Sequence, residues 1–113
     1  MKSNREIKFR LWCENKKEWE KVQWFTAAYN AKTHILEQYT GINDKNDVEI
    51  FEGDVVKLNV LIEPIRGEGT YWVHKLFVVE FKEQCYFPQR LTESEIVGNI
   101  HENPELLEAN NEK

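Results

Sequence analysis

The chain has 113 residues, of which 41% are hydrophobic and 31% charged, and its net charge is −5. This length fits one domain that buries roughly two-thirds of its unfolded surface, and the composition excludes a disordered chain. The acidic balance also argues against binding nucleic acid by charge alone, because such proteins displace counterions from phosphates with a positive face. We expect one globular domain over residues 1–113.

The cysteines and the N-terminal residues indicate the cellular compartment in which the protein works. Cys13 and Cys85 lack the spacing of a metal-binding or redox motif. Met1–Arg10 is charged throughout, unlike a signal peptide, and no apolar run approaches the ~20 residues of a membrane helix. The sequence therefore predicts a cytoplasmic protein with reduced thiols and no cofactor.

The first expected strand has period-two alternation, with Ile7, Phe9 and Leu11 on one face. Glu14–Lys17 is a polar turn. Trp19–Tyr29 fits two structures, because apolar residues fall at helical spacing while paired aromatic residues and the neighbouring strands favour a strand. We predict a strand over 19–29 and keep a helix as the alternative.

The centre of the chain predicts a β-hairpin. Two apolar runs, Ile35–Tyr39 and Val48–Phe51, flank the polar loop Asn43–Asp47, and short runs separated by an Asn/Asp-rich turn are typical of hairpins. A third strand, Val55–Ile62, follows at once.

Turn residues separate the strands that we expect in the second half of the chain. Pro64 and the glycines after it end the third strand, and Thr70–Phe81 then predicts one long strand. Cys85–Phe87 and Glu95–Ile100 predict two shorter strands.

Asn103-Pro104-Glu105 is a helix start, because asparagine caps free backbone N–H groups and proline at the first helical position loses no hydrogen bond. The sequence thus predicts a mainly β fold, an antiparallel small barrel- or sandwich-like domain with a short C-terminal helix.

Four segments, in order and reaching from end to end, resemble the YopX family of phage and prophage proteins. They are REIKFRLW at Arg5–Trp12, QYTGINDKN at Gln38–Asn46, EIFEGDVV at Glu49–Val56 and VGNIHENPELL at Val97–Leu107. Two positions depart from the family: Cys13 stands where an acidic residue is frequent, and Asp47-Val48 where Gly-Lys is frequent. Asp47 still tolerates the positive φ that glycine would suit.

The resemblance implies a β-rich fold, a phage or prophage origin and self-association. It transfers no catalytic residue, ligand or established activity. We therefore expect a non-enzymatic, homo-oligomeric accessory or interaction module, with a phage or host protein as a further conceivable partner and no membrane partner.

Two motifs admit a chemical interpretation beside a structural one. Tyr39-Thr40-Gly41 is a ligand loop or, as we favour, a strand end with glycine in a special backbone conformation. Glu52 and Asp54 are the general acid and base of a hydrolase or, as we favour, flank a bend at Gly53 that leads into a strand. We assign no catalytic residue.

Metal and thiol chemistry depends on folding. None of His34, His74 and His101 stands at ligand spacing from another histidine or from either cysteine, so only tertiary structure can assemble a site. We assign no metal. Cys85 is a conceivable nucleophile, and we predict instead that it is a small buried hydrophobic residue.

The alternative function is a nucleic-acid-binding small β-barrel that stacks bases on aromatic rings beside cations. Its candidate residues lie near the N-terminus: Lys8, Arg10, Trp12, Lys16 and Lys17.

The number of aromatic residues indicates self-association. Four Trp, four Tyr and six Phe are many for one small core, so some rings should lie near the surface and form contacts between copies. The candidate contact residues are Trp12, Trp19, Trp24 and Trp72.

Overall fold

A computed structural model describes residues 7–22, 32–65, 67 and 69–107, and this part of the chain is mainly antiparallel β structure. The strands are β1 (Phe9–Cys13), β2 (Glu18–Glu20), β3 (His34–Asn43), β4 (Glu49–Phe51), β5 (Asp54–Ile62), β6 (Tyr71–Val78), β7 (Glu80–Lys82), β8 (Cys85–Phe87) and β9 (Glu95–Asn99). A 3₁₀ turn, η1 (Leu91–Glu93), precedes β9. The predicted fold class is confirmed.

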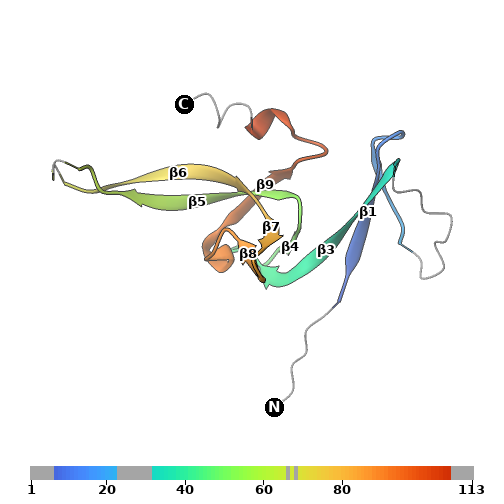
Figure 1. Ribbon diagram of the computed structural model, residues 1–113, viewed down its shortest axis with the longest axis horizontal. Coiled ribbons are helices and arrows are strands. Elements are labelled where there is room, and N and C mark those ends of the chain that lie inside the picture. Colours follow the sequence, from blue (N-terminus) through green and yellow to red (C-terminus); the bar gives the residue numbers. More distant parts are fainter. Residues whose placement is uncertain (1–6, 23–31, 66, 68, 108–113) are drawn as a thin grey trace, which may run out of the picture.

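The strands form three sheets, in the orders β2-β1-β3-β4, β6-β5-β9 and β7-β8. In Figure 1 the long strand β3 runs from the β1–β2 side to the centre of the molecule, where β4, β7 and β8 lie. The paired strands β5 and β6 project away from that centre on the opposite side. The described strands curl into an antiparallel half-barrel.

The predicted N-terminal strand is β1, which pairs with β2 and β3. Leu11, Trp12 and Cys13 are all buried, so both faces of the end of β1 are covered. The expected strand over 19–29 is confirmed at Trp19 and Glu20 of β2 and is wrong at Lys21 and Val22, which follow the end of β2. Residues 23–29 lie outside the described part of the chain.

The predicted central hairpin is β3–β4, and it contains a bulge near Gly41, whose φ is 86°. The Thr40 hydroxyl accepts a hydrogen bond from the Ile42 N–H at 3.0 Å and donates to the Ile50 carbonyl at 2.9 Å. Asp47 has the positive φ expected of it, 65°. Gly41 has the special backbone conformation that the structural interpretation of this motif predicted, but the motif is not a strand end, because β3 continues to Asn43.

Asp44 ties the hairpin turn to β9. Its Oδ1 accepts the N–H groups of Asn46 at 2.8 Å and Val48 at 2.9 Å, and its Oδ2 accepts the N–H of Ile96 at 3.0 Å. The side chain is buried, which by itself raises the carboxyl pKa, but the three backbone hydrogen bonds outweigh burial and lower it below 3.8.

The prediction of one long strand over Thr70–Phe81 is wrong, because the chain breaks at Val79 between β6 and β7. Val79 is 1% exposed, and its N–H donates to the Asp54 carbonyl while its carbonyl accepts from the Gly53 N–H, both at 2.9 Å. These bonds draw the chain towards the start of β5, so β7 leaves in a new direction and pairs with β8.

The buried apolar cluster is small: Ile50, Val56, Val79 and Leu91. It lies where β4, β5, η1 and the break between β6 and β7 meet. The C-terminal helix starts as predicted, with helical residues at Glu105–Leu107. Within the described residues, no helix is long and apolar enough to cross a membrane.

We predict that Asp44→Ala lowers the free energy of unfolding at pH 7 by about 2–4 kcal/mol, because it leaves three backbone N–H groups without their acceptor. Because the folded-state pKa lies below that of the unfolded chain, the contribution of Asp44 is full above pH 4 and is lost as pH falls through the folded value. Denaturant melts from pH 7 to pH 2 should therefore be flatter for the variant.

The matched control is Asp47→Asn, which changes an exposed carboxylate of the same turn and should stay within about 0.5 kcal/mol of the natural protein. Equal melts for Asp44→Ala and the natural protein would contradict this role.

Candidate functional site

The most organised polar cluster of the described residues is an ion network centred on Arg10. The Arg10 Nε donates to Glu37 Oε1 at 2.9 Å, and its Nη2 lies 2.9 Å from Asp54 Oδ1. Nη2 also donates to the Glu52 carbonyl at 3.2 Å. Glu37 and Asp54 are 5% and 3% exposed, so Arg10 bridges two buried carboxylates from β3 and β5.

His101 joins this network from the C-terminal segment. Its Nε2 lies 2.7 Å from Glu37 Oε2, so both oxygens of Glu37 have partners. The imidazole stacks on Trp12, with ring centroids 5.2 Å apart and an angle of 17° between the planes. His101 and Glu37 are 64 positions apart in sequence, so this contact closes the C-terminal segment over β1 and β3.

Aromatic rings enclose the charges. The Arg10 guanidinium carbon lies 4.4 Å from the centroid of Trp19 and 4.9 Å from that of Phe51. Trp12 and Trp19 meet edge to face at 4.9 Å. The rings limit contact with water, which strengthens the ion pairs and makes the loss of either partner expensive.

The surroundings of Asp54 raise its carboxyl pKa, and burial is the largest cause. Burial raises its pKa above the usual value, and the negative charge of Glu37 adds to this, although the Arg10 guanidinium and the Phe51 N–H act in the opposite direction. The Phe51 N–H donates to Asp54 Oδ2 at 2.8 Å, so each carboxylate oxygen of Asp54 has a partner.

Gly53 lies against this network at the point where the sheets meet. Its φ is 90°, and a Cβ here would lie 2.7 Å from Glu37 Cδ and closer still to Oε2. The Gly53 carbonyl also accepts the Ile100 N–H at 3.0 Å, and the Glu52 N–H donates to the Gln38 carbonyl at 3.0 Å. Only glycine fits a positive φ this close to another side chain.

The bend interpretation of Glu52 and Asp54 agrees with these contacts. Asp54 faces Arg10, whereas the Glu52 carboxylate accepts the Gln38 N–H and the Tyr86 hydroxyl, both at 3.3 Å. The two carboxylates therefore serve different neighbours. Sequence reasoning missed Glu37 and the contact that His101 makes with it, and the signal for Glu37 was a charged side chain inside the apolar run Ile35–Tyr39.

Two surface hollows lie near residues singled out from the sequence. Thr40 and Gly41 line one of about 510 Å³ together with Cys85 and Arg90. Glu37 and Gly53 border another, of about 370 Å³. Cys85 is exposed, so the prediction that it is buried was wrong: β8 pairs only with β7 among the described strands, which leaves this cysteine at the surface.

The histidines and cysteines separate into different environments. Cys13 and His34 are paired residues on β1 and β3, and Glu20 of β2 lies beside them. His101 is engaged with Glu37, and His74 is exposed on β6. Folding therefore assembles one His/Cys/Glu group among the described residues, and Glu20 is its member that sequence reasoning missed.

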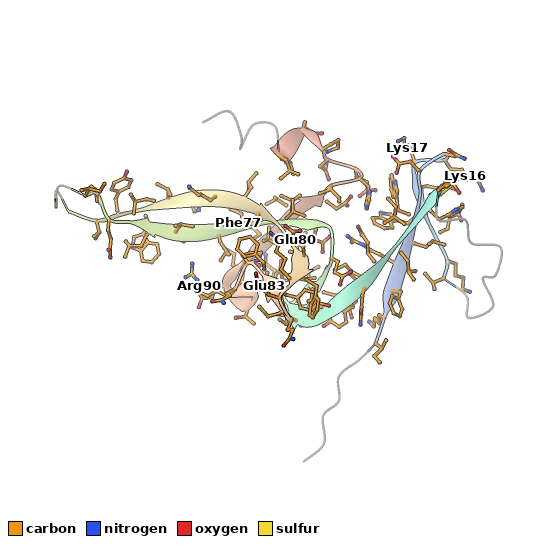
Figure 2. The ribbon with its side chains drawn as sticks, in the orientation of Figure 1. Lys16, Lys17, Phe77, Glu80, Glu83 and Arg90 are labelled. Atoms are coloured by element: carbon orange, nitrogen blue, oxygen red, sulfur yellow. The ribbon has the colours of Figure 1, made fainter. Side chains whose placement is uncertain are left out.

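Each cation proposed for nucleic-acid binding faces a carboxylate. The ion pairs are Lys8–Glu49, Arg10 with Glu37 and Asp54, Lys16–Glu20 and Lys17–Glu14. Figure 2 shows Lys16 and Lys17 at the outer end of the β1–β2 hairpin. Arg10 is an internal bridge and does not present its charge to a ligand.

The four tryptophans differ in position. We expected some of them near the surface, but Trp12 is 2% exposed and packs on Trp19 and His101, so it is an interior residue of this chain. Trp19 is half-buried, and Trp24 lies outside the described residues. Trp72 is 60% exposed on β6, as expected for a contact residue.

The fold and this network can be compared with known proteins. The family model described as YopX protein matches residues 3–108, which is nearly the whole chain. The chain belongs to the YopX family. Among curated proteins, none matches it.

One solved structure similar to this YopX chain is that of protein EF1440 from Enterococcus faecalis. The identity is 22%, the match covers 90% of this chain and 98% of the other, and the TM-score is 0.62. At this identity the likeness shows a shared fold.

The structure gives a physical account of the segments that carry the YopX resemblance. Arg10, Asp54 and His101 come from three of them: Arg10 bonds to both Asp54 and Glu37, and His101 bonds to Glu37. Asp44, in the remaining segment, accepts the Ile96 N–H. The segments meet through buried polar contacts, so their side chains hold the fold of this family member together.

We predict that Gly53→Ala lowers the free energy of unfolding by about 2–4 kcal/mol, because alanine meets both an unfavourable φ and a Glu37 carboxylate fixed by Arg10 and His101. Denaturant melts at neutral pH measure the effect.

Gly69→Ala is the matched control. Gly69 has a φ of 92°, and among the described residues nothing lies within 4 Å of the place that its Cβ would take. Backbone strain alone should cost about 1–2 kcal/mol there. Equal losses at the two glycines would show that the Glu37 contact contributes nothing.

Proposed function

We propose that this protein is a phage- or prophage-derived, non-enzymatic interaction module that works in the cytoplasm as a homo-oligomer joined through the β5–β6 arm. Membership of the YopX family supports the phage or prophage origin. The exposed thiol of Cys85 is in keeping with a reducing compartment.

The observation that carries the proposal is the exposed apolar surface on the arm. Near its outer end the arm exposes Leu61 by 39%, Tyr71 by 53%, Trp72 by 60% and Ile65 fully. Leu61 pairs with Trp72 across the two strands, so their side chains share a face. The arm projects from the rest of the molecule in Figure 1.

The position of β6 at the edge of its sheet supports the proposal that a second copy of the chain binds to the arm. Among the described strands β6 pairs with β5 alone, through eight residues, and we expect an added strand at the outer part of its other edge, Tyr71–His74. Antiparallel pairing of this edge with the same edge of a second copy follows a two-fold axis, the commonest symmetry of homo-oligomers.

The charge distribution also supports a second copy of the chain as the partner of the arm. Two copies of a chain with net charge −5 repel each other at most approaches. The stretches Leu58–Ile62 and Tyr71–His74 contain no aspartate, glutamate, lysine or arginine. These stretches of the arm are therefore a surface on which two acidic copies can meet without opposing like charges.

The contacts of the acidic residues support a non-enzymatic function. The two carboxylate oxygens of Asp54 bond to Arg10 and to the Phe51 N–H. Those of Glu37 bond to His101 and to Arg10. A general base needs a reachable oxygen beside its substrate, whereas these oxygens hold strands together.

We predict that light scattering at micromolar concentration gives a mass near twice the 13.5 kDa of one chain or a higher multiple. Tyr71→Glu with Trp72→Glu should shift the mass to that of one chain, because carboxylates on the arm of both copies repel. A mass of 13.5 kDa for the natural protein would contradict the homo-oligomer and make a different protein the partner of the arm.

The matched control is Phe81→Glu, which places the same charge at a 56% exposed aromatic residue on β7, outside the arm. Its mass should equal that of the natural protein. Far-ultraviolet circular dichroism of all variants checks that the fold is retained.

The nucleic-acid alternative receives less support, because its cations are paired with carboxylates. We predict that single-stranded DNA binds at physiological salt with a Kd no tighter than the ~10⁻⁴–10⁻⁶ M of non-specific contacts. Fluorescence anisotropy with labelled oligonucleotides measures this, and nanomolar affinity lost on Lys16→Glu with Lys17→Glu would favour the alternative.

A further inference from the structure

We propose that Cys13, Glu20 and His34 bind a single Zn²⁺ ion that links β1, β2 and β3. The three side chains offer a thiolate sulfur, a carboxylate oxygen and an imidazole nitrogen, and these atoms all lie within 4.8 Å of one another. Tetrahedral zinc bonds of 2.0–2.3 Å require ligand separations of roughly 3.3–3.8 Å, so small side-chain rotations close the site.

The sheet brings the ligands to one face. Cys13 and His34 are direct partners across β1 and β3, so their side chains point the same way. Glu20 on β2 is the partner of Leu11, which lies two residues before Cys13 and shares its face. The Arg10 network uses the opposite face of β1, so the two clusters are independent.

The environment suits a bound ion. Cys13 is 3% exposed, whereas the side chains of Glu20 and His34 are 26% and 20% exposed, so one ligand is buried and two remain within reach of solvent. Thiolate with imidazole and carboxylate selects Zn²⁺ over the hard ions Mg²⁺ and Ca²⁺, which prefer oxygen ligands alone. Three protein ligands leave the fourth tetrahedral position for water.

A neighbouring hydroxyl orients the imidazole. Thr33 Oγ1 lies 2.8 Å from His34 Nδ1, while His34 Nε2 lies 3.1 Å from Glu20 Oε1. When Nε2 binds zinc, the neutral imidazole carries its one proton on Nδ1, and Nδ1–H donates to the Thr33 hydroxyl, as the second ring nitrogen of a metal-binding histidine ordinarily donates to a neighbour. The Cys13 thiol releases its proton as the sulfur–zinc bond forms.

Zinc must also compete with Lys16 for the Glu20 carboxylate. Lys16 Nζ lies 3.4 Å from Glu20 Oε2, so the Glu20 carboxylate gives up part of that exposed ion pair when it binds the metal. An exposed pair contributes little to stability, whereas a divalent ion attracts the thiolate and carboxylate together. The ion should therefore stabilise the three-stranded part of the sheet.

The test titrates Zn²⁺, and Co²⁺ as its spectroscopic substitute, into the untagged, reduced full chain. We expect one ion per chain, a thiolate-to-cobalt charge-transfer band and a higher midpoint of thermal unfolding. Cys13→Ser should abolish the band, and His34→Gln or Glu20→Gln should weaken Zn²⁺ binding tenfold or more. Thr33→Val, which removes only the orienting hydroxyl, should weaken it about 10–100-fold.

Cys85→Ser and His74→Gln are the matched controls, because each removes an exposed residue of the same type outside the cluster. Both should retain the band and the affinity. Because Cys13 is buried, circular dichroism checks its variant, and the partly exposed Glu20 and His34 variants test the site if that variant unfolds. No stoichiometric binding, or binding lost in Cys85→Ser and kept in His34→Gln, would overturn the proposal.

Discussion

The fold depends on the contact between the Glu37 carboxylate and the bend at Gly53. Arg10 and His101 hold the two oxygens of Glu37, and Gly53 packs where no other residue fits. The same bend bonds to Gln38, Val79 and Ile100 through its backbone. Buried ion pairs add little net stability compared with apolar packing, but the loss of one partner leaves an uncompensated charge, so they strongly disfavour other arrangements of these strands.

This polar centre takes the place of a large apolar core. The buried apolar cluster comprises Ile50, Val56, Val79 and Leu91, and the sheets around it do not close. The Cα radius of gyration of 16.7 Å exceeds the about 13 Å of a compact domain of similar length. The β5–β6 arm therefore keeps exposed apolar rings, and these are the surface that a second copy would cover.

The segments that carry the YopX resemblance and the surfaces that carry the proposals are largely different parts of this molecule. Three of the segments that resemble YopX proteins contribute to the ion network: Arg10 bonds to Asp54, and His101 reaches the network through Glu37, the residue before the second segment. The arm and the Cys13–Glu20–His34 group lie largely outside those segments. The segments that resemble YopX proteins therefore contain residues that stabilise the fold. The proposals about what the protein binds depend on the arm and on the metal-ligating group.

Local patterns in the sequence determined most strands, the central hairpin, the bend at Gly53, the positive φ of Asp47 and the family. Each depends on alternation or turn chemistry among neighbouring residues. Tertiary structure alone decided that Arg10 and Trp12 turn inward, that the chain breaks at Val79, and that Cys13, Glu20 and His34 meet. These outcomes depend on which distant side chain lies opposite, such as Glu37 for Arg10, 27 residues away, and no local periodicity encodes that pairing.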